Sequence, residues 1–205
     1  MKKPENRPAV SPRPALLLDR DGVLISNRED YVQSLEQVEI FDQALVALAR
    51  AAQSDYLIMI VTNQSAVGRG LISLETAQAI NSYVVQRIER AGGRVDGVYM
   101  CPHAPQAGCP CRKPRPGLIL EAAREHDLDL RRSILLGDAL TDIQAGQAAG
   151  VGTTGLLRSG RGRSQAQLPR AADLSEFEIY DTLLDAVTSR LAPDLFPLSA
   201  DGQVD

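Results

Sequence analysis

The sequence contains no tryptophan, and only 4% of its 205 residues are aromatic. Aliphatic side chains and alanine must therefore supply most of the hydrophobic core. No apolar run approaches the roughly 20 residues that a membrane-spanning helix needs. The first residues, MKKPENRPAVSPRP, are rich in proline and lack the apolar segment of a secretory signal. These absences predict a cytoplasmic protein without a membrane partner.

Positive charge is concentrated only in RSGRGR, residues 158–163, and the net charge of the chain is -4. Because proteins that bind nucleic acid usually carry a strongly basic face, we expect no nucleic-acid partner. The length suits one core, and the chain shows no internal repeat. We therefore expect a monomer with one domain at residues 15–192. Residues 1–14 predict a disordered tail, and residues 193–205 predict a flexible one.

Short apolar runs alternate with amphipathic stretches along the chain. The runs of strand length cover residues 15–19, 57–61, 95–100, 133–137 and 151–157. The stretches of helix length cover residues 42–52, 74–91, 117–126, 141–149 and 176–191. Unbroken apolar strands separated by helices indicate a parallel sheet that is covered on both faces. The predicted fold class is a doubly wound, Rossmann-like α/β sandwich without a large cap domain.

Polar residues follow four of these strands, at the edge where open α/β sheets bind their ligands. They are Asp19 and Asp21 after the first strand, Thr62 after the second, Lys113 after the third, and Asp138 and Asp142 after the fourth. A single aspartate in such a place is usually a turn former or a helix cap. Several buried carboxylates, however, need a cation to relieve their repulsion, and oxygen ligands suit Mg²⁺. The sequence therefore predicts a magnesium site at this edge.

These residue types are suited to phosphoryl transfer. Asp19 can attack phosphorus as a nucleophile and form an aspartyl-phosphate. Asp21 can protonate the leaving oxygen and then activate water. Thr62 and Lys113 can stabilise the negative charge that spreads over the phosphoryl oxygens. We therefore predict that these four residues are catalytic.

The motifs resemble, in order, the four motifs of the haloacid dehalogenase (HAD) superfamily of phosphatases. They are Asp19-x-Asp21-Gly22, Thr62, Lys113 and Gly137-Asp138-x3-Asp142. The longer stretches DRDGV, TNQSAVGRG, CPCRKPRPG and GDALTDIQAG are similar to those of the D-glycero-D-manno-heptose 1,7-bisphosphate 7-phosphatase family. This resemblance implies a sugar bisphosphate substrate from nucleotide-activated heptose synthesis. It also implies Mg²⁺ on Asp19, Asp21 and Asp138. Asp142 lies about one helical turn after Asp138, where it is placed to orient metal-bound water or Lys113 behind the metal.

The same resemblance implies a set of substrate-binding residues. They are Asp30, Tyr31, Asn63, Gln64, Ser65, Arg69, Arg112 and Lys113. Asp30 and Tyr31 lie one residue further along the chain from Asp21 than the matching residues of the family do. Arg69 is either an added cation that suits a second phosphate or an exposed loop residue. Ala139 stands where some relatives carry a lysine, so that a substrate contact is either missing or replaced.

All three cysteines and one of the two histidines lie in CPHAPQAGCPC, residues 101–111. An odd number of cysteines fits no disulfide framework, whereas three thiolates and an imidazole complete a tetrahedral zinc site. The spacing is unlike that of common zinc fingers, and the residues alone leave incidental thiols open. The resemblance implies a zinc loop with the ligands Cys101, His103, Cys109 and Cys111. We expect this zinc to be structural and to position the Arg-Lys pair that follows.

Other functions remain open. Histidinol-phosphate phosphatases share the aspartates and a similar CPH…CxCRKP loop, but they tend toward TNQDG where this chain has TNQSAVGRG. Another small phosphomonoester is a related possibility. A polynucleotide 3′-phosphatase would need a basic, aromatic groove, for which the composition gives no sign. A non-enzymatic, zinc-dependent interaction module would leave the aspartates without a role, although every catalytic position is chemically intact.

Overall fold

The computed structural model describes residues 11–191 and contains one sheet of six strands, all parallel, in the order β3-β2-β1-β4-β5-β6. The strands are β1 Ala15–Leu18, β2 Leu57–Asn63, β3 Gly97–Cys101, β4 Ile134–Gly137, β5 Thr153–Leu157 and β6 Glu178–Tyr180. The strand order reverses at β1, which lies between β2 and β4. In open parallel sheets such a reversal marks the place where ligands bind.

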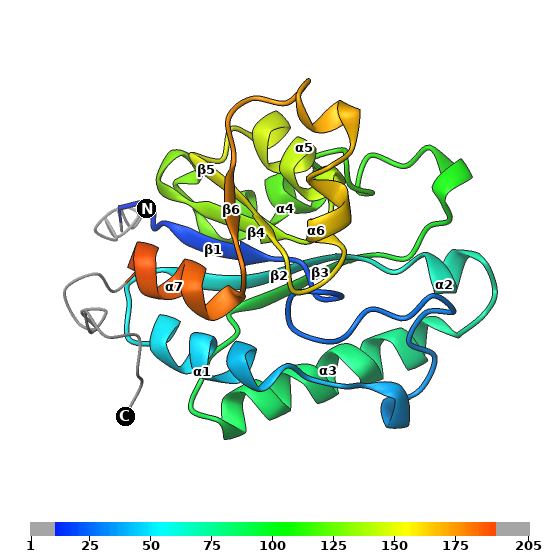
Figure 1. Cartoon of the computed structure of the whole chain (residues 1–205). Coiled ribbons are helices and arrows are strands. Elements are labelled where there is room, and N and C mark those ends of the chain that lie inside the picture. Colours follow the sequence, from blue (N-terminus) through cyan, green and yellow to red (C-terminus); the bar gives the residue numbers. More distant parts are fainter. Residues whose placement is uncertain (1–10, 192–205) are drawn as a thin grey trace, which may run out of the picture.

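Helices cover both faces of this sheet, with α1, α3 and α7 on one side and α4 and α5 on the other (Figure 1). The α-helices are α1 Asp42–Ala51, α2 Ser65–Gly68, α3 Leu74–Arg90, α4 Gly117–His126, α5 Leu140–Ala149, α6 Gly162–Gln165 and α7 Leu183–Leu191. The 3-10 turns are η1 Leu35–Gln37, η2 Pro105–Ala107, η3 Leu130–Arg132 and η4 Pro169–Ala171. The predicted doubly wound α/β class is confirmed.

The alternation of side chains along β1 explains the two layers. Leu16 and Leu18 are buried in a cluster with residues of α1, α3 and α7. Leu17 points to the other face and is buried in a cluster with residues of α4 and α5. Successive strand residues face opposite sides, so a strand that is apolar throughout must be covered twice. Within the described residues, no helix is long and apolar enough to cross a membrane.

The stretch predicted as one helix over 176–191 is instead a strand followed by a helix. Residues 178–180 form β6, which pairs in parallel with β5 and extends the sheet. The helix begins only at Leu183, after a turn in which the Thr182 backbone N–H donates to the Asp185 carboxylate at 2.9 Å. The free edge of β5 supplies hydrogen-bond partners that the local sequence pattern does not reveal, and this tertiary pairing outweighs the helical pattern.

The ends of the domain differ slightly from the sequence prediction. Residues 11–14, which were assigned to the tail, lie against the domain: Pro14 is buried, and the Arg13 N–H donates to the Asp127 carbonyl at 3.2 Å. The remainder of the two predicted tails, residues 1–10 and 193–205, lies outside the described residues.

Candidate active site

The segments that follow β1, β2, β3, β4 and β5 gather at the carboxyl end of the sheet and line a cavity. In Figure 1 this end lies on the right, where α2, α6 and the long connections converge. Among the predicted site residues, those that line the cavity are Asp19, Asp21, Tyr31, Asn63, Gln64, Ser65, Arg112, Lys113 and Asp142. The cavity is therefore formed by segments that are far apart in the sequence.

Lys113 lies at the centre of a buried ion-pair cluster. Its Nζ is 2.9 Å from Asp19 Oδ1 and 2.6 Å from Asp142 Oδ1, and it also donates to the Val61 carbonyl at 2.7 Å. Asp19, Lys113 and Asp142 are each less than a tenth exposed. These contacts hold the ammonium group against the predicted nucleophile.

The charges in this cluster follow from burial and pairing. Burial lowers the pKa of Lys113, but the carboxylates of Asp142 and Asp19 outweigh it and hold that pKa above its usual value. Burial raises the pKa of Asp142 to about 6, against the opposing pull of Lys113. Lys113 therefore remains a cation, as required of a group that faces a phosphate.

Asp142 is positioned by the start of α5. Its Oδ2 accepts a hydrogen bond from the Ala139 backbone N–H at 3.0 Å, which satisfies one free donor of the helix N-terminus. Gly137 makes room for this carboxylate, because a Cβ there would lie 2.3 Å from it. Asp142 thus contacts Lys113, and its predicted role of orienting metal-bound water or Lys113 stays a prediction.

Asp138 is completely buried and is surrounded by donors. Its Oδ2 accepts from Asn27 Nδ2 at 2.5 Å, from the Arg161 backbone N–H at 2.9 Å and from Arg161 Nε at 3.1 Å. Its Oδ1 accepts from Arg161 Nη2 at 3.0 Å. Asp19, Asp138 and Asp142 each offer an oxygen within 4.8 Å of the others. This compact set of hard oxygen donors fits a divalent cation such as Mg²⁺.

Asp21 lines the same cavity but is not part of that carboxylate group. Its side chain is held by Arg20, whose Nη2 lies 3.0 Å from Oδ1, and by Gln64, whose Nε2 donates to Oδ2 at 2.8 Å. Arg20 is itself buried and donates to Asn81 Oδ1 at 2.7 Å. The structure thus separates Asp21, as an oriented carboxyl group, from the three aspartates that cluster.

The residues after β2 support the neighbouring Arg-Lys pair. Asn63 makes two hydrogen bonds to the Lys113 backbone, both of 3.1 Å. Arg112 Nη1 donates to Ser65 Oγ at 2.6 Å. Thr62 is fully buried, and its hydroxyl accepts from Gln64 Nε2 at 2.9 Å. Thr62 does not line the cavity in this arrangement, whereas its neighbours do.

The three remaining substrate-binding predictions have different positions. Tyr31 lines the cavity and has a positive φ of 66°, which is uncommon for a residue other than glycine. The Arg69 guanidinium lies over the Tyr31 ring, 5.9 Å from its centroid, and Arg69 does not itself line the cavity. Asp30 is exposed outside the cavity and pairs with Arg28 at 3.1 Å.

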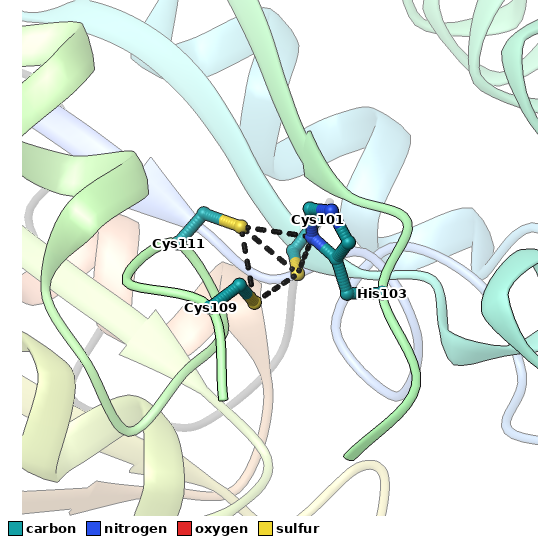
Figure 2. A group of neighbouring side chains, drawn as sticks. All are labelled: Cys101, His103, Cys109 and Cys111. Atoms are coloured by element: carbon teal, nitrogen blue, oxygen red, sulfur yellow. Dashed lines mark hydrogen bonds between the residues drawn. The ribbon is translucent and has the colours of Figure 1, made fainter. Parts of the chain in front are cut away.

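The four predicted zinc ligands come together (Figure 2). The Cys111 sulfur is 3.2 Å from that of Cys101 and 3.3 Å from that of Cys109, and His103 Nδ1 is 3.3 Å from the Cys111 sulfur. These separations are too long for disulfide bonds of about 2.05 Å. They approach the edge of about 3.8 Å that a tetrahedron with zinc–sulfur bonds of about 2.3 Å would have.

The cysteine loop, residues 101–111, is tied directly to the active site. The Cys101 carbonyl accepts from the Gln64 backbone N–H at 2.7 Å. Gly68, at the end of α2, lies so close to the loop that a Cβ there would be 2.2 Å from the Ala104 nitrogen. Cys111 directly precedes Arg112 and Lys113. The cysteine loop and the cavity are therefore joined by direct contacts and by the chain itself.

The sequence prediction missed the segment that follows β5. Ser159 Oγ donates to the Gly22 carbonyl at 2.9 Å, and Arg161 binds Asp138 as described above. Asn27, between the first motif and Tyr31, was also missed. The sequence signal was the basic stretch RSGRGR, whose glycines and arginines carry no periodicity and none of the recognised motifs.

Comparisons with known proteins place this geometry in a family. The HAD-hydrolase-like family model matches residues 110–186. A D-glycero-beta-D-manno-heptose-1,7-bisphosphate 7-phosphatase of Bordetella bronchiseptica is 38% identical over 164 residues, which cover 78% of this chain and 91% of the relative. The chain belongs to the D-glycero-beta-D-manno-heptose-1,7-bisphosphate 7-phosphatase family. This membership confirms the resemblance of the motifs and the class of HAD-type phosphoric monoester hydrolase.

Solved structures agree with membership of the heptose bisphosphate phosphatase family. The D,D-heptose 1,7-bisphosphate phosphatase of B. bronchiseptica, complexed with magnesium and phosphate, matches with a TM-score of 0.79 and 36% identity over 85% of this chain and 97% of that one. The corresponding enzyme of Burkholderia thailandensis matches with a TM-score of 0.65 and 27% identity over 86% of this chain and 97% of that one. Both chains are thus matched over nearly their whole length.

Proposed function

We propose that this protein removes the 7-phosphate of D-glycero-D-manno-heptose 1,7-bisphosphate in a Mg²⁺-dependent reaction. The observation that carries the proposal is the buried contact between Lys113, Asp19 and Asp142 beside Asp138, at the carboxyl end of the central strands. The family supports this choice of substrate, because a B. bronchiseptica relative of that name is 38% identical. The bound magnesium and phosphate of its solved structure support the choice of metal and of phosphoryl chemistry.

Asp19 and Asp138 would hold the metal, since each offers an oxygen within 4.8 Å of the other. Asp142 belongs to the same group, but its two oxygens bond Lys113 and the Ala139 backbone N–H, so it would support the site from behind. Mg²⁺ bound there would neutralise charge on the phosphoryl oxygens and keep the phosphorus in place. The sequence prediction that Asp21 is a further ligand remains a prediction. Its carboxylate is engaged by Arg20 and Gln64.

In the proposed reaction, an Asp19 carboxylate oxygen attacks phosphorus, and the bond from phosphorus to the C7 oxygen breaks. Asp21 donates its proton to that oxygen, which leaves as the alcohol. Asp21, now ionised, takes a proton from water, and this water cleaves the aspartyl-phosphate to release phosphate and free Asp19. Lys113 stabilises the negative charge on the phosphoryl group, and Gln64 keeps Asp21 oriented. Thr62 bonds Gln64 from below the cavity, and its own role toward the phosphoryl group stays a prediction.

We further propose that the four-residue cluster Cys101, His103, Cys109 and Cys111 binds a structural zinc ion. All four positions of a tetrahedron are supplied by the chain, so no position is left for a substrate. The cysteine loop contains several prolines and is largely exposed, and a metal clip can fix it where apolar burial cannot. The zinc would thereby position Arg112 and Lys113.

The proposed substrate also suggests where and how the protein works. A doubly phosphorylated sugar cannot cross a membrane unaided, because the transfer of its charges out of water costs too much. We therefore place the enzyme in the cytoplasm, without a nucleic-acid or membrane partner.

Phosphorus NMR of the reaction tests this proposal. With Mg²⁺, the signal of the 7-phosphate should give way to inorganic phosphate while the 1-phosphate signal persists. With a chelator in place of Mg²⁺, both signals should persist. Loss of the 1-phosphate first, or equal loss of both, would contradict the proposed reaction.

A further inference from the structure

The segment after β5, residues 158–171, forms a wall of the active-site cavity. Arg161, Gln165 and Arg170 line the cavity together with Asp19 and Asp21. The proposed reaction assigns none of the three a role. A wall that carries two guanidinium groups beside a phosphate site raises the question of what they bind.

Several contacts anchor this wall to the catalytic loops. Ser159 Oγ donates to the Gly22 carbonyl at 2.9 Å, and the Leu140 backbone N–H donates to Gln165 Oε1 at 3.3 Å. At Gly160 the packing is so close that a Cβ would lie 2.4 Å from Asp138 Oδ2. These contacts hold the wall in a fixed position beside the active site.

The guanidinium groups of the wall retain hydrogen-bond donors. Arg161 uses Nε and Nη2 for Asp138, and its side chain is 56% exposed. Arg170 is exposed, and its contact in the described part of the chain is Nη2 to Gln165 Oε1, at 3.3 Å. Each guanidinium carries five N–H donors, arranged to match the oxygens of a phosphate.

The balance of charge in the cavity points to a second anion. Lys113 is paired with Asp19 and Asp142, and Asp138 is paired with Arg161. Among residues 11–191, Arg112 and Arg170 have no ion pair with a carboxylate. The cavity thus carries more positive charge than its inner carboxylates require.

We propose that Arg161 and Arg170 form a second anion subsite, which binds the phosphate monoester that is not transferred. Arg170 supplies donors that no carboxylate occupies, and Arg161 presents the remaining edge of its guanidinium. Ala139 lines the same side of the cavity and carries no charge. Its neighbours Asp138 and Leu140 are hydrogen-bonded to Arg161 and Gln165 of the wall. The subsite rests on the proposed function and would make the enzyme specific for a sugar with two phosphates.

Steady-state kinetics on two substrates test the subsite. We compare kcat/KM for D-glycero-D-manno-heptose 1,7-bisphosphate with kcat/KM for D-glycero-D-manno-heptose 7-phosphate, and take their ratio for each variant. Arg161→Gln and Arg170→Gln should each lower this ratio about tenfold or more, as the loss of charged hydrogen bonds to a phosphate predicts. Because Arg161 also contacts Asp138, Arg161→Gln should lower kcat/KM for both substrates. The ratio of the two kcat/KM values therefore reports on the subsite alone.

Arg163→Gln is the matched control, since Arg163 lies in the same segment, is exposed and does not line the cavity. Its ratio should stay near that of the wild type. Calorimetry with D-glycero-D-manno-heptose 1-phosphate adds a readout without turnover: Arg170→Gln should weaken binding about tenfold.

The outcomes separate the two proposals. If the wild type prefers the bisphosphate but both variants keep the ratio, the subsite is wrong and the proposed function stands. If the wild type has no preference for the bisphosphate, the proposed substrate is wrong, and the subsite for its second phosphate is overturned with it.

Discussion

Lys113 shows how single residues determine the chemistry of this site. A buried ammonium is unfavourable by itself, and here it is stabilised by Asp19 and Asp142 at distances below 3 Å. Asp19 therefore has a fixed position and faces a cation. This is the arrangement that a carboxylate nucleophile needs, since a phosphate that approaches it would otherwise be repelled.

Replacement of the nucleophile is the first prediction at this scale. Asp19→Asn removes the ionised oxygen but keeps the shape of the side chain, and Lys113 retains its contact with Asp142. We expect phosphate release to fall at least about 10³-fold, with an unchanged circular dichroism spectrum. Residual activity within about tenfold of the wild type would exclude Asp19 as the nucleophile.

The second prediction concerns the pH dependence of the three thiols in the proposed zinc site. Burial alone would raise the pKa of Cys109. Hydrogen bonds with Cys111 and Cys101 outweigh burial and lower this pKa to about 7. Burial raises the pKa of Cys111 to about 12 and also raises that of Cys101. Only a thiolate reacts readily with iodoacetamide. In protein stripped of metal, Cys109 should therefore be labelled first.

The rate of Cys109 labelling should increase with pH, because only the deprotonated thiol reacts. Below pH 7 the rate of Cys109 labelling should rise about tenfold per pH unit, and above pH 7 it should level off. Zinc should protect all the thiols. Mass spectrometry of peptides checks the order of labelling, and modification of Cys111 before Cys109 would contradict this account.

At the scale of elements, the segment after β5 is the least expected part of the site. It follows a buried strand and returns over the loop after β1. Ser159 bonds Gly22 of the first motif, and Arg161 bonds Asp138 of the fourth. Gly160 permits this approach. A side chain at that position would meet Asp138 and also Gly22, whose Cα lies 2.6 Å from the position of a Cβ.

Gly160→Ala tests this packing. We expect a loss of about 1–3 kcal/mol in the free energy of unfolding, because the segment must move away from Asp138. Phosphate release should also fall. Gly92→Ala is the control: a Cβ there meets nothing within 4 Å, but φ is 85°, so only a backbone cost of about 1 kcal/mol is expected. Urea unfolding and activity assays measure both, and equal effects on activity would contradict the role of the segment.

The elements differ in how well the sequence predicts them. The strands β1 and β4 and residues 57–61 of β2 are apolar runs that the sequence pattern identifies. Ser73 caps α3 through a 3.1 Å hydrogen bond from the Thr76 N–H. The strand β6 was missed, because it is short and depends on pairing with β5. The wall at 158–171 was missed for a related reason, since only the folded chain brings it to Asp138.

At the scale of the whole molecule, the cysteine loop, residues 101–111, and the active site form one unit. The loop contacts α2 at Gly68, and it continues into Arg112 and Lys113, which line the cavity. The sequence predicted both sites and a link between them through Arg112 and Lys113. The contacts between them, such as that from Gln64 to Cys101, depend on the order of β2 and β3 in the sheet.

Removal of zinc tests this coupling. Treatment with a chelator, followed by excess Mg²⁺, should leave activity at least about tenfold reduced, because Arg112 and Lys113 lose their support. Addition of one equivalent of zinc should restore both activity and thermal stability. Cys109→Ser should reproduce the loss. Full activity of the zinc-free protein in Mg²⁺ would contradict a positioning role for the metal.

The fold alone does not determine the substrate of the enzyme. Histidinol-phosphate phosphatases resemble this chain in the aspartates and in the cysteine loop. The most direct test is kcat/KM for D-glycero-D-manno-heptose 1,7-bisphosphate and for histidinol phosphate, measured side by side with Mg²⁺ and with Asp19→Asn as the blank. We predict a preference for the bisphosphate of at least about 100-fold. A substrate with a single phosphate would leave the arginines of the second anion subsite without a partner. Equal turnover of both substrates, or a preference for histidinol phosphate, would contradict the assignment.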